Sequence, residues 1–269
     1  AEWARSAPLD VIVTDHHEAS GPVAPVLALV NPKLGTDERI KALAGVGVAF
    51  KLCHALVKKG RDTGVPAAAA TDLRDYLDLV GIGTIADIVP LQDENRIYAR
   101  HGLARLNKTD SIGLKALIEV AGIKGEVESY HVGFILGPRL NAAGRIGDAQ
   151  AALELLLTDQ PDRARSLAMQ LDRANRERQD IEARIVREAT TQIDSFFEPA
   201  KHFALVVASE QWHAGVVGIV ASRLSAKYRR PAVVIALDEA GMGRGSCRSI
   251  EGFDLVHHLG ACSDLLMRF

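Results

Sequence analysis

The chain has 269 residues and a formal net charge of −2, with 48% hydrophobic and 25% charged residues, which is an ordinary globular composition. This balance of charge excludes a broadly basic DNA-binding protein, so any nucleic-acid site must be a local cluster of positive side chains. The sequence has no run of about 20 apolar residues, which is the length that a membrane-spanning helix requires. The widely separated Cys53, Cys247 and Cys262 indicate neither a zinc site nor a disulfide framework, so we expect a cytoplasmic protein.

The length exceeds that of a typical single domain, so two packed units are expected. In the first part of the chain, residues 9–13 are apolar and β-branched, which predicts a buried strand ending just before Asp15. Residues 26–30 predict a second strand, stopped by an Asn-Pro pair. Strands alternating with helices indicate an α/β unit with a mostly parallel sheet. The helical spacing of apolar residues occurs in segments 45–59, 72–79 and 95–106.

Asp15, His16 and His17 follow the first predicted strand, at the kind of strand end where α/β proteins gather ligands. One carboxylate and two imidazoles suit a first-row divalent ion, and imidazole shifts the preference from Mg²⁺ toward Mn²⁺. Side chains alternate along a strand, so we expect one ligand, one orienting partner and one residue facing a substrate. The alternative is a polar loop without a metal, as for the His257-His258 pair, which has no strand-end context.

The metal hypothesis requires a second carboxylate, and Asp87 is the candidate. It lies in the apolar segment 81–91, where a buried charge is costly unless it is paired or bound to a metal. A helix cap or a salt bridge is the alternative interpretation. The hypothesis therefore requires His16 and Asp87, about seventy positions apart, to converge on one cation.

A helical register of apolar or small residues runs from 159 to 197, with charged residues on the other faces. Thr158 or Asp159 can cap its start, and Pro161 is tolerated in the first turn. At 1.5 Å per residue this helix is about 55 Å long, so we interpret it as a spacer between two domains. Two shorter helices with a bend are the alternative.

A second, smaller α/β unit is predicted after this helix. The sequence predicts a strand over 203–208, a helix over 216–228 and a strand over 231–237 in this unit. The glycines of segment 241–245 then predict a Gly-rich loop.

Six motifs resemble, in order, a known family. Residues 11–17 (VIVTDHH) and 83–87 (GTIAD) resemble two signatures of the DHH phosphoesterase superfamily. Four further segments narrow the resemblance to the RecJ family of 5′-to-3′ single-stranded-DNA exonucleases, and the resemblance covers essentially the whole chain. These segments are 137–145 (GPRLNAAGR), 171–179 (LDRANRERQ), 212–221 (WHAGVVGIVA) and 243–249 (GRGSCRS).

The resemblance implies a DHH domain over 1–157, a connecting helix over 158–197 and a DHHA1-like substrate-binding domain over 198–269. It implies two Mn²⁺ or Mg²⁺ ions in the intact enzyme, which activate a water molecule and stabilise charge on the phosphorus. His16 and Asp87 would be metal ligands and His17 would face the scissile phosphate. Asp15 would orient the site or share in the metal shell.

The resemblance also implies contacts with DNA. Arg139 and Arg145 would meet phosphates, with Asn141 as a neutral donor; a salt-bridged loop is the alternative for this segment. Ser246 and Arg248 would hold a terminal 5′-phosphate. His213 would either line the cleft or cap a strand.

The family pattern includes an Asp-x-Asp motif and an Asp-ended strand before Asp-His-His, and a Gly-Gly-His motif further on. None of these occurs in this sequence. We therefore expect a fragment, incomplete in both domains, that by itself binds metal weakly and hydrolyses DNA poorly.

The expected function is exonucleolytic hydrolysis of single-stranded DNA in recombination and repair. We expect a monomer, for which a single-strand-binding protein or a helicase is a candidate partner. A DHH phosphodiesterase acting on short RNA or cyclic dinucleotides is one rival, although the long helix and the Ser-Cys-Arg-Ser segment favour the exonuclease. A non-catalytic DNA-binding scaffold is the other rival, and it would have no need of His16, His17 and Asp87.

Overall fold

The computed structural model describes residues 9–18 and 26–267. The chain forms two compact units. The first takes the residues up to Leu140 together with Ala152–Met169, and the second takes Asn141–Ala151 together with the residues from Gln170 onward. The chain thus passes between the units at three points, each of them inside a helix, whereas the domain boundaries expected at 157/158 and 197/198 follow the sequence linearly. Within the described ranges, no helix has the length and apolar character that crossing a membrane requires.

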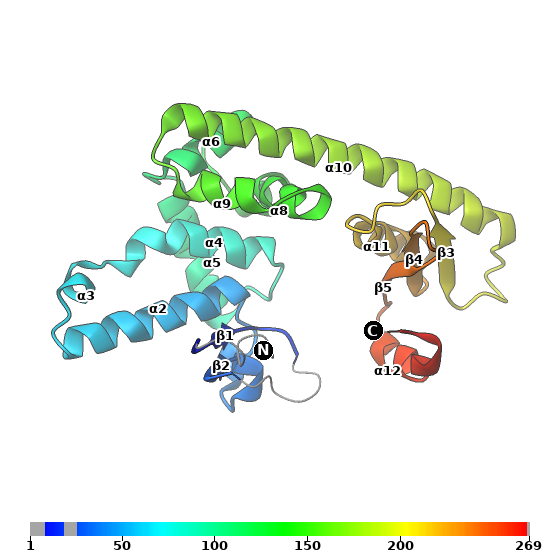
Figure 1. The fold of residues 1–269 in the computed structure, drawn as a ribbon, viewed down its shortest axis with the longest axis horizontal. Helices are drawn as coiled ribbons and strands as arrows, with labels where there is room; N and C mark the ends of the chain where they lie inside the picture. Colours follow the sequence, from blue (N-terminus) through cyan, green and yellow to red (C-terminus); the bar gives the residue numbers. More distant parts are fainter. Residues whose placement is uncertain (1–8, 19–25, 268–269) are drawn as a thin grey trace. The chain divides into compact units, whose positions relative to one another are not determined.

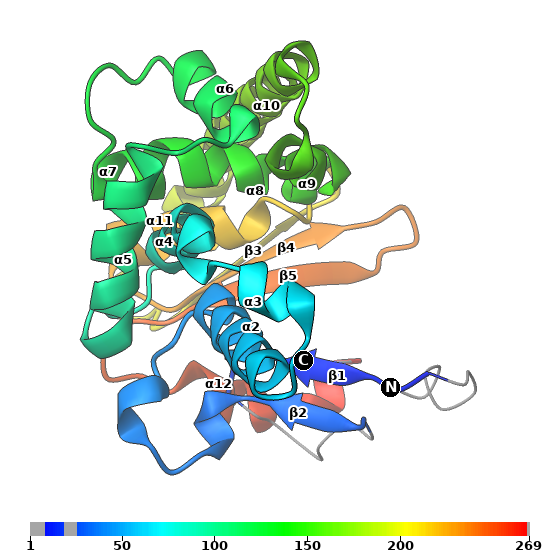
Figure 2. The same ribbon diagram turned by 90° about the vertical axis from the view of Figure 1, so that its left-hand side faces the viewer.

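The first unit begins with two short strands, β1 (Ile12–Thr14) and β2 (Ala28–Val30), which pair in parallel with Ile12 opposite Ala28. Both strands lie where the sequence predicts them, and an Asn-Pro pair ends the second. The first strand is not buried as predicted, since Ile12 is 53% exposed. Helices make up the rest of this unit (Figures 1 and 2). They are η1 (Pro32–Leu34), η2 (Glu38–Ile40), α2 (Gly45–Asp62), α3 (Pro66–Ala70), η3 (Leu73–Tyr76), α4 (Leu77–Ala86), α5 (Asp93–Leu106), α6 (Ile112–Val120), α7 (Ser129–His131) and the π-helical turn η4 (Val132–Leu136).

The helix predicted over 72–79 is placed differently in the structure. The Asp72 side chain accepts a hydrogen bond from the backbone N–H of Arg74 and starts the 3-10 turn η3, after which α4 runs on to Ala86. Gly81 of α4 is needed because this helix crosses α5 with its backbone in contact. A Cβ on Gly81 would lie 2.6 Å from the Cα of Gly102, closer than packed atoms approach.

Two further helices, α8 (Gly137–Ile146) and α9 (Gln150–Leu157), precede the long helix α10 (Pro161–Phe196). Helix α10 is continuous over 36 residues, so the predicted long helix is confirmed and the bent alternative is wrong. Pro161 opens its first turn, where a missing N–H costs nothing. Ala164 and Leu167 are buried in the first unit, whereas Ile185 and Ile193 are buried in the second.

The second unit contains a three-stranded sheet in the order β3–β4–β5, in which β5 is Gly243–Arg248. Strands β3 (Leu205–Ser209) and β4 (Ala232–Leu237) are parallel, and α11 (Val217–Tyr228) connects them. Its core combines the buried face of β4, one face of α11 and the C-terminal half of α10. The helix α12 (Leu255–Gly260) and the turn η5 (Ser263–Leu265) follow.

The Gly-rich loop predicted over 241–245 is wrong in part. Residues Gly243–Arg248 form strand β5, antiparallel to β4, with Gly245 opposite Ile235. Glycine is required there because the side chain of Ile235 covers the strand: a Cβ on Gly243 would lie 2.8 Å from Ile235 Cγ2. The glycines that indicate a loop in the sequence thus accommodate a neighbouring side chain in the sheet.

Candidate functional site

Asp15, His16 and His17 form a tight turn at the end of β1. The Asp15 carboxylate accepts hydrogen bonds from the backbone N–H groups of His16 and His17, at 2.7 Å and 3.2 Å, and lies 2.8 Å from His17 Nδ1. The side-chain hydrogen bond with His17, helped by the two backbone bonds, lowers the pKa of Asp15 to about 2. Asp15 is therefore a carboxylate at neutral pH, and it orients the ring of His17.

The structure brings His16 and Asp87 together. His16 Nδ1 lies 3.6 Å from Asp87 Oδ2, and the two side chains are 20% and 40% exposed. This separation is longer than a hydrogen bond. A small divalent ion lies roughly 2.1 Å from each of its ligand atoms, so two ligand atoms of one ion are at most twice that distance apart. The separation of His16 Nδ1 and Asp87 Oδ2 is within this limit, and both atoms can contact one cation. The first residue of α2, Gly45, supports the imidazole, since a Cβ there would lie 3.2 Å from His16 Cδ2.

Asp87 occupies the C-cap of α4, where its backbone N–H donates to the carbonyl oxygen of Gly83. The helix-cap alternative thus describes its position correctly. It does not explain the side chain, because a carboxylate at a helix C-terminus is opposed by the helix dipole. The next residue, Ile88, has φ +59°, a conformation that is strained for a β-branched residue. The Asp87 carboxylate and the Ile88 backbone are thus both held in positions that cost stability.

Asn31 is a site residue that the sequence reasoning missed. It follows β2, its side-chain Nδ2 donates to the carbonyl oxygen of His17 at 3.0 Å, and its Oδ1 accepts from the backbone N–H of Lys33. Asn31 therefore ties the turn after β1 to the turn after β2. The available signal was its place at the end of a strand expected to be parallel to the first.

Arg139 and Arg145 both lie on α8, at positions six residues apart that do not share a helix face. Arg139 belongs to the first unit, and its Nη1 donates to the carbonyl oxygen of Ile135 at 2.8 Å. Asn141 and Arg145 belong to the second unit, and both are exposed. The two arginines therefore lie on different faces of α8.

Arg145 is instead brought against the turn that precedes α11. Its Nη1 donates to the carbonyl oxygen of Gly215 at 3.4 Å, and a Cβ on Gly215 would lie only 1.9 Å from the Arg145 carbonyl oxygen. Nδ1 of the exposed His213 accepts from the backbone N–H of Gly215 at 3.1 Å. His213 therefore stabilises this turn and remains accessible.

Ser246 and Arg248 lie two residues apart on β5 and share a face of the strand. Arg248 Nη1 lies 3.5 Å from Ser246 Oγ, and its Nε donates to Ser222 Oγ of α11 at 2.9 Å. A Cβ on Gly218 would lie 3.0 Å from Ser246 Oγ, so this glycine lets α11 approach the pair. Two hydroxyls and a guanidinium thus gather over the first turns of α11. Ser222 and Gly218 were not identified from the sequence.

The motif over 171–179 contributes a buried ion pair. Arg178 Nη1 contacts Glu182 Oε2 at 2.8 Å, with the two side chains 10% and 3% exposed. Burial lowers the pKa of Arg178, while the charge of Glu182 opposes that shift. Arg223 of α11 also pairs with Glu182. This network links α10 to the helix that approaches Ser246.

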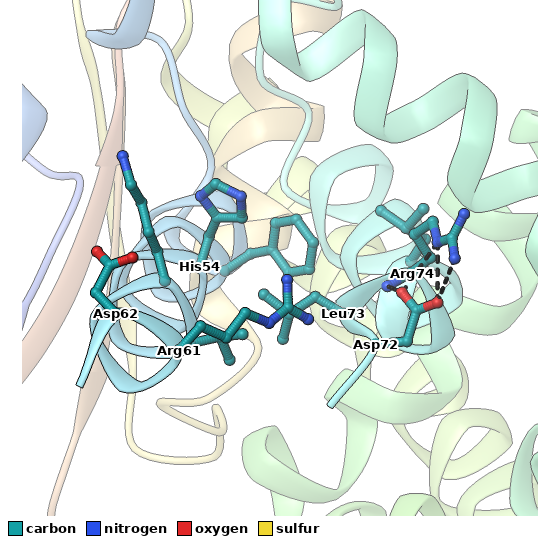
Figure 3. A pocket seen from close by; sticks show the side chains of 10 residues that line it. His54, Arg61, Asp62, Asp72, Leu73 and Arg74 are labelled. Atoms are coloured by element: carbon teal, nitrogen blue, oxygen red, sulfur yellow. Dashed lines mark hydrogen bonds and ion pairs between the residues drawn. The ribbon is translucent and has the colours of Figure 1, made fainter. Parts of the chain in front are cut away.

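A cleft of about 460 Å³ lies elsewhere in the first unit, between α2 and the η3–α4 segment (Figure 3). Arg61 donates to the backbone oxygens of Ala68 and Thr71, and Arg74 is paired with Asp72. The arginines that line this cleft thus form their contacts within the protein. None of the predicted site residues lines the cleft. Among the described residues, no cluster of three or more His, Cys, Asp or Glu side chains could hold a metal ion. The His16–Asp87 pair therefore provides two donors.

Comparison with known proteins shows that the chain is similar to a group of nucleases. The DHHA1 domain family matches residues 201–264. The single-stranded-DNA-specific exonuclease RecJ of Bacillus subtilis (strain 168) is 45% identical over 272 residues, which cover 100% of this chain and 33% of that protein. The protein of the same name from Haemophilus influenzae is 42% identical over 251 residues, covering 91% of this chain and 44% of its own length.

The fold is also similar to a solved structure, described as RecJ in complex with Mn²⁺ from Thermus thermophilus. The TM-score is 0.83 with 38% sequence identity, over 98% of this chain and 37% of that one. The chain therefore spans between a third and a half of the length of the curated relatives described above.

Proposed function

We propose that the chain, which is similar over its whole length to RecJ exonucleases, carries part of a metal-dependent exonuclease acting on single-stranded DNA. The observation that supports this most directly is the approach of His16 Nδ1 to Asp87 Oδ2, at 3.6 Å across about seventy residues of sequence. The 5′-to-3′ polarity and a role in recombination and repair are proposed from the family resemblance.

His16 and Asp87 are the residues that would hold a divalent ion. An imidazole and a carboxylate suit Mn²⁺, and carboxylate alone also suits Mg²⁺. A cation there also offsets the unfavourable charge of Asp87 at the end of α4. When bound, such an ion supplies Lewis-acid activation of water and neutralises charge on the phosphoryl group.

The neighbouring side chains have separate tasks in this proposal. Asp15 accepts the hydrogen bonds of the turn and fixes Nδ1 of His17, which leaves Nε2 of this exposed ring to face the scissile phosphate. Asn31 holds the carbonyl oxygen of His17 and so keeps the turn in place. Because only two donors converge in the described residues, we expect weak metal binding and slow hydrolysis by this chain alone.

Phosphate contacts away from the reacting centre are proposed for two groups of residues. Arg139, Asn141 and Arg145 would contact the DNA backbone from α8, and His213 from the turn before α11. Ser246 and Arg248 would hold a terminal 5′-phosphate, with hydroxyl and guanidinium donors on one face of β5.

The test is hydrolysis of 5′-labelled single-stranded DNA with Mn²⁺ or Mg²⁺, before and after chelation with EDTA. Substitution of a residue that hydrogen-bonds to a metal ligand typically lowers activity roughly 10–100-fold. His16→Ala and Asp87→Ala remove the ligands themselves, so each should lower the rate by more than that. His101→Ala and Asp62→Ala are matched controls, since both side chains are exposed on helices of the same unit. Equal activity of the His16→Ala and wild-type proteins would overturn the metal assignment.

The two rival functions give different results in the same assay. A phosphodiesterase for small substrates would hydrolyse dinucleotides or cyclic dinucleotides faster than long single strands. A non-catalytic scaffold would bind DNA equally well with and without His16 and Asp87, and would show no metal-dependent hydrolysis.

A further inference from the structure

Two aromatic rings of the first unit are stacked on each other and remain largely exposed. The rings of Tyr130 in α7 and Phe134 in η4 have centroids 5.1 Å apart and an interplanar angle of 27°. Their exposed fractions are 59% and 72%. A single exposed ring is ordinary on a protein surface. A nearly parallel pair instead presents a flat face of the kind on which a further planar ring can stack.

The backbone that carries these rings is held in place. Helix α7 has a capping box, in which the Glu128 side chain accepts from the backbone N–H of His131 and His131 Nδ1 accepts from the backbone N–H of Glu128. The following turn η4 is closed by a bond from the N–H of Gly137 to the carbonyl oxygen of Val132, a π-helical spacing. π-helical turns are rare and occur often at functional sites. The ring pair is therefore preformed.

The C-terminal end of this segment packs next to the residue that precedes Asp87. Turn η4 packs on the last turn of α4, where a Cβ on Gly137 would lie 3.0 Å from the Cβ of Ala86, the residue before Asp87. After η4, the guanidinium of Arg139 donates to the carbonyl oxygen of Ile135, the residue next to Phe134. The segment that carries the stacked ring pair and Arg139 thus packs on the helix end that carries Asp87.

We propose that Tyr130 and Phe134 form a platform on which a base of single-stranded DNA stacks beside the Asp87 site, an inference that rests on the proposed function. Single-stranded nucleic acid is bound by aromatic rings that stack with its bases and by cations that contact its phosphates. Arg139 beside Phe134 supplies such a cation, which is the reason to prefer DNA over an apolar protein partner.

The first experiment measures binding of the chain to a fluorescein-labelled single-stranded oligonucleotide in EDTA, so that hydrolysis plays no part. Loss of one base stack predicts binding roughly 5- to 150-fold weaker for Phe134→Ala. Phe203→Ala is the matched control, because Phe203 is 73% exposed in the second unit and outside the platform. Phe134→Trp should retain the affinity, and its added emission should be quenched when DNA binds.

The second experiment repeats the measurement with an abasic oligonucleotide of the same length. The platform predicts that Phe134→Ala and wild type bind abasic DNA equally. Equal losses on both oligonucleotides, or no binding by wild type, would overturn it, and so would a Phe134→Ala protein that binds ordinary DNA normally. Equal losses combined with hydrolysis that depends on His16 and Asp87 would leave the proposed function standing. A base-dependent loss without metal-dependent hydrolysis would refute the hydrolase and keep the platform.

Discussion

The crossing of α4 and α5 offers a test of how packing controls the position of Asp87. In Gly102→Ala, the new Cβ would lie 2.4 Å from the Cα of Gly81 and 2.7 Å from the carbonyl oxygen of Leu77. Both are backbone atoms, so neither can rotate away. Since ordinary contact begins near 3.4 Å, the helices must separate by about 1 Å, or the crossing must tilt.

Two opposing effects determine the stability of this variant. Replacing glycine by alanine inside a helix is favourable by about 1 kcal/mol. Overpacking a close contact costs about 1–3 kcal/mol, and occasionally more. Because the obstacle is backbone, we expect the cost to win and the free energy of unfolding to fall by about 1–2 kcal/mol. Since α4 ends at Asp87, a shift of about 1 Å should also lower metal-dependent hydrolysis by roughly 100-fold.

Urea unfolding and hydrolysis of single-stranded DNA, measured on the same preparations, check both expectations. Gly133→Ala is the matched control, because the nearest atom to its Cβ is Ile85 Cγ2 at 4.0 Å; its stability should not fall. A Gly102→Ala protein that is as stable and as active as wild type would show that the two backbones are not in contact. It would also show that the packing of α4 on α5 does not control the position of Asp87.

Two further stability predictions follow from buried charge and from backbone strain. Arg178→Ala should lower the free energy of unfolding by up to about 3–5 kcal/mol, because the buried Glu182 then keeps only the largely exposed Arg223 as its partner. Arg223→Ala should cost clearly less, since that side chain is 63% exposed; equal losses in chemical denaturation would contradict the burial argument. Ile88→Gly should raise the thermal midpoint, because relief of a left-handed backbone worth about 1–2 kcal/mol exceeds the entropy cost of glycine. A lower midpoint would mean that the 88% exposed side chain contributes more than its burial implies.

The sequence determined the features that depend on neighbouring residues. The β-branched run before Asp15 predicts β1, and the unbroken apolar register predicts a single long helix, found as α10. Such patterns can be read in a sequence because side-chain period follows directly from the geometry of a strand or helix. The order of six motifs likewise predicts the resemblance to RecJ exonucleases.

The tertiary structure decided the features that depend on residues far apart. The approach of His16 to Asp87 requires α4 to end beside the turn after β1, which no local pattern encodes. The glycines of β5 predicted a loop from the sequence. In the structure they accommodate the side chain of Ile235 on the neighbouring strand β4, a contact that the local sequence does not encode. The stacked ring pair depends on a π-helical turn, whose hydrogen-bond spacing leaves no clear period in the sequence. Local periodicity therefore determined the elements, and packing between backbones determined which side chains meet.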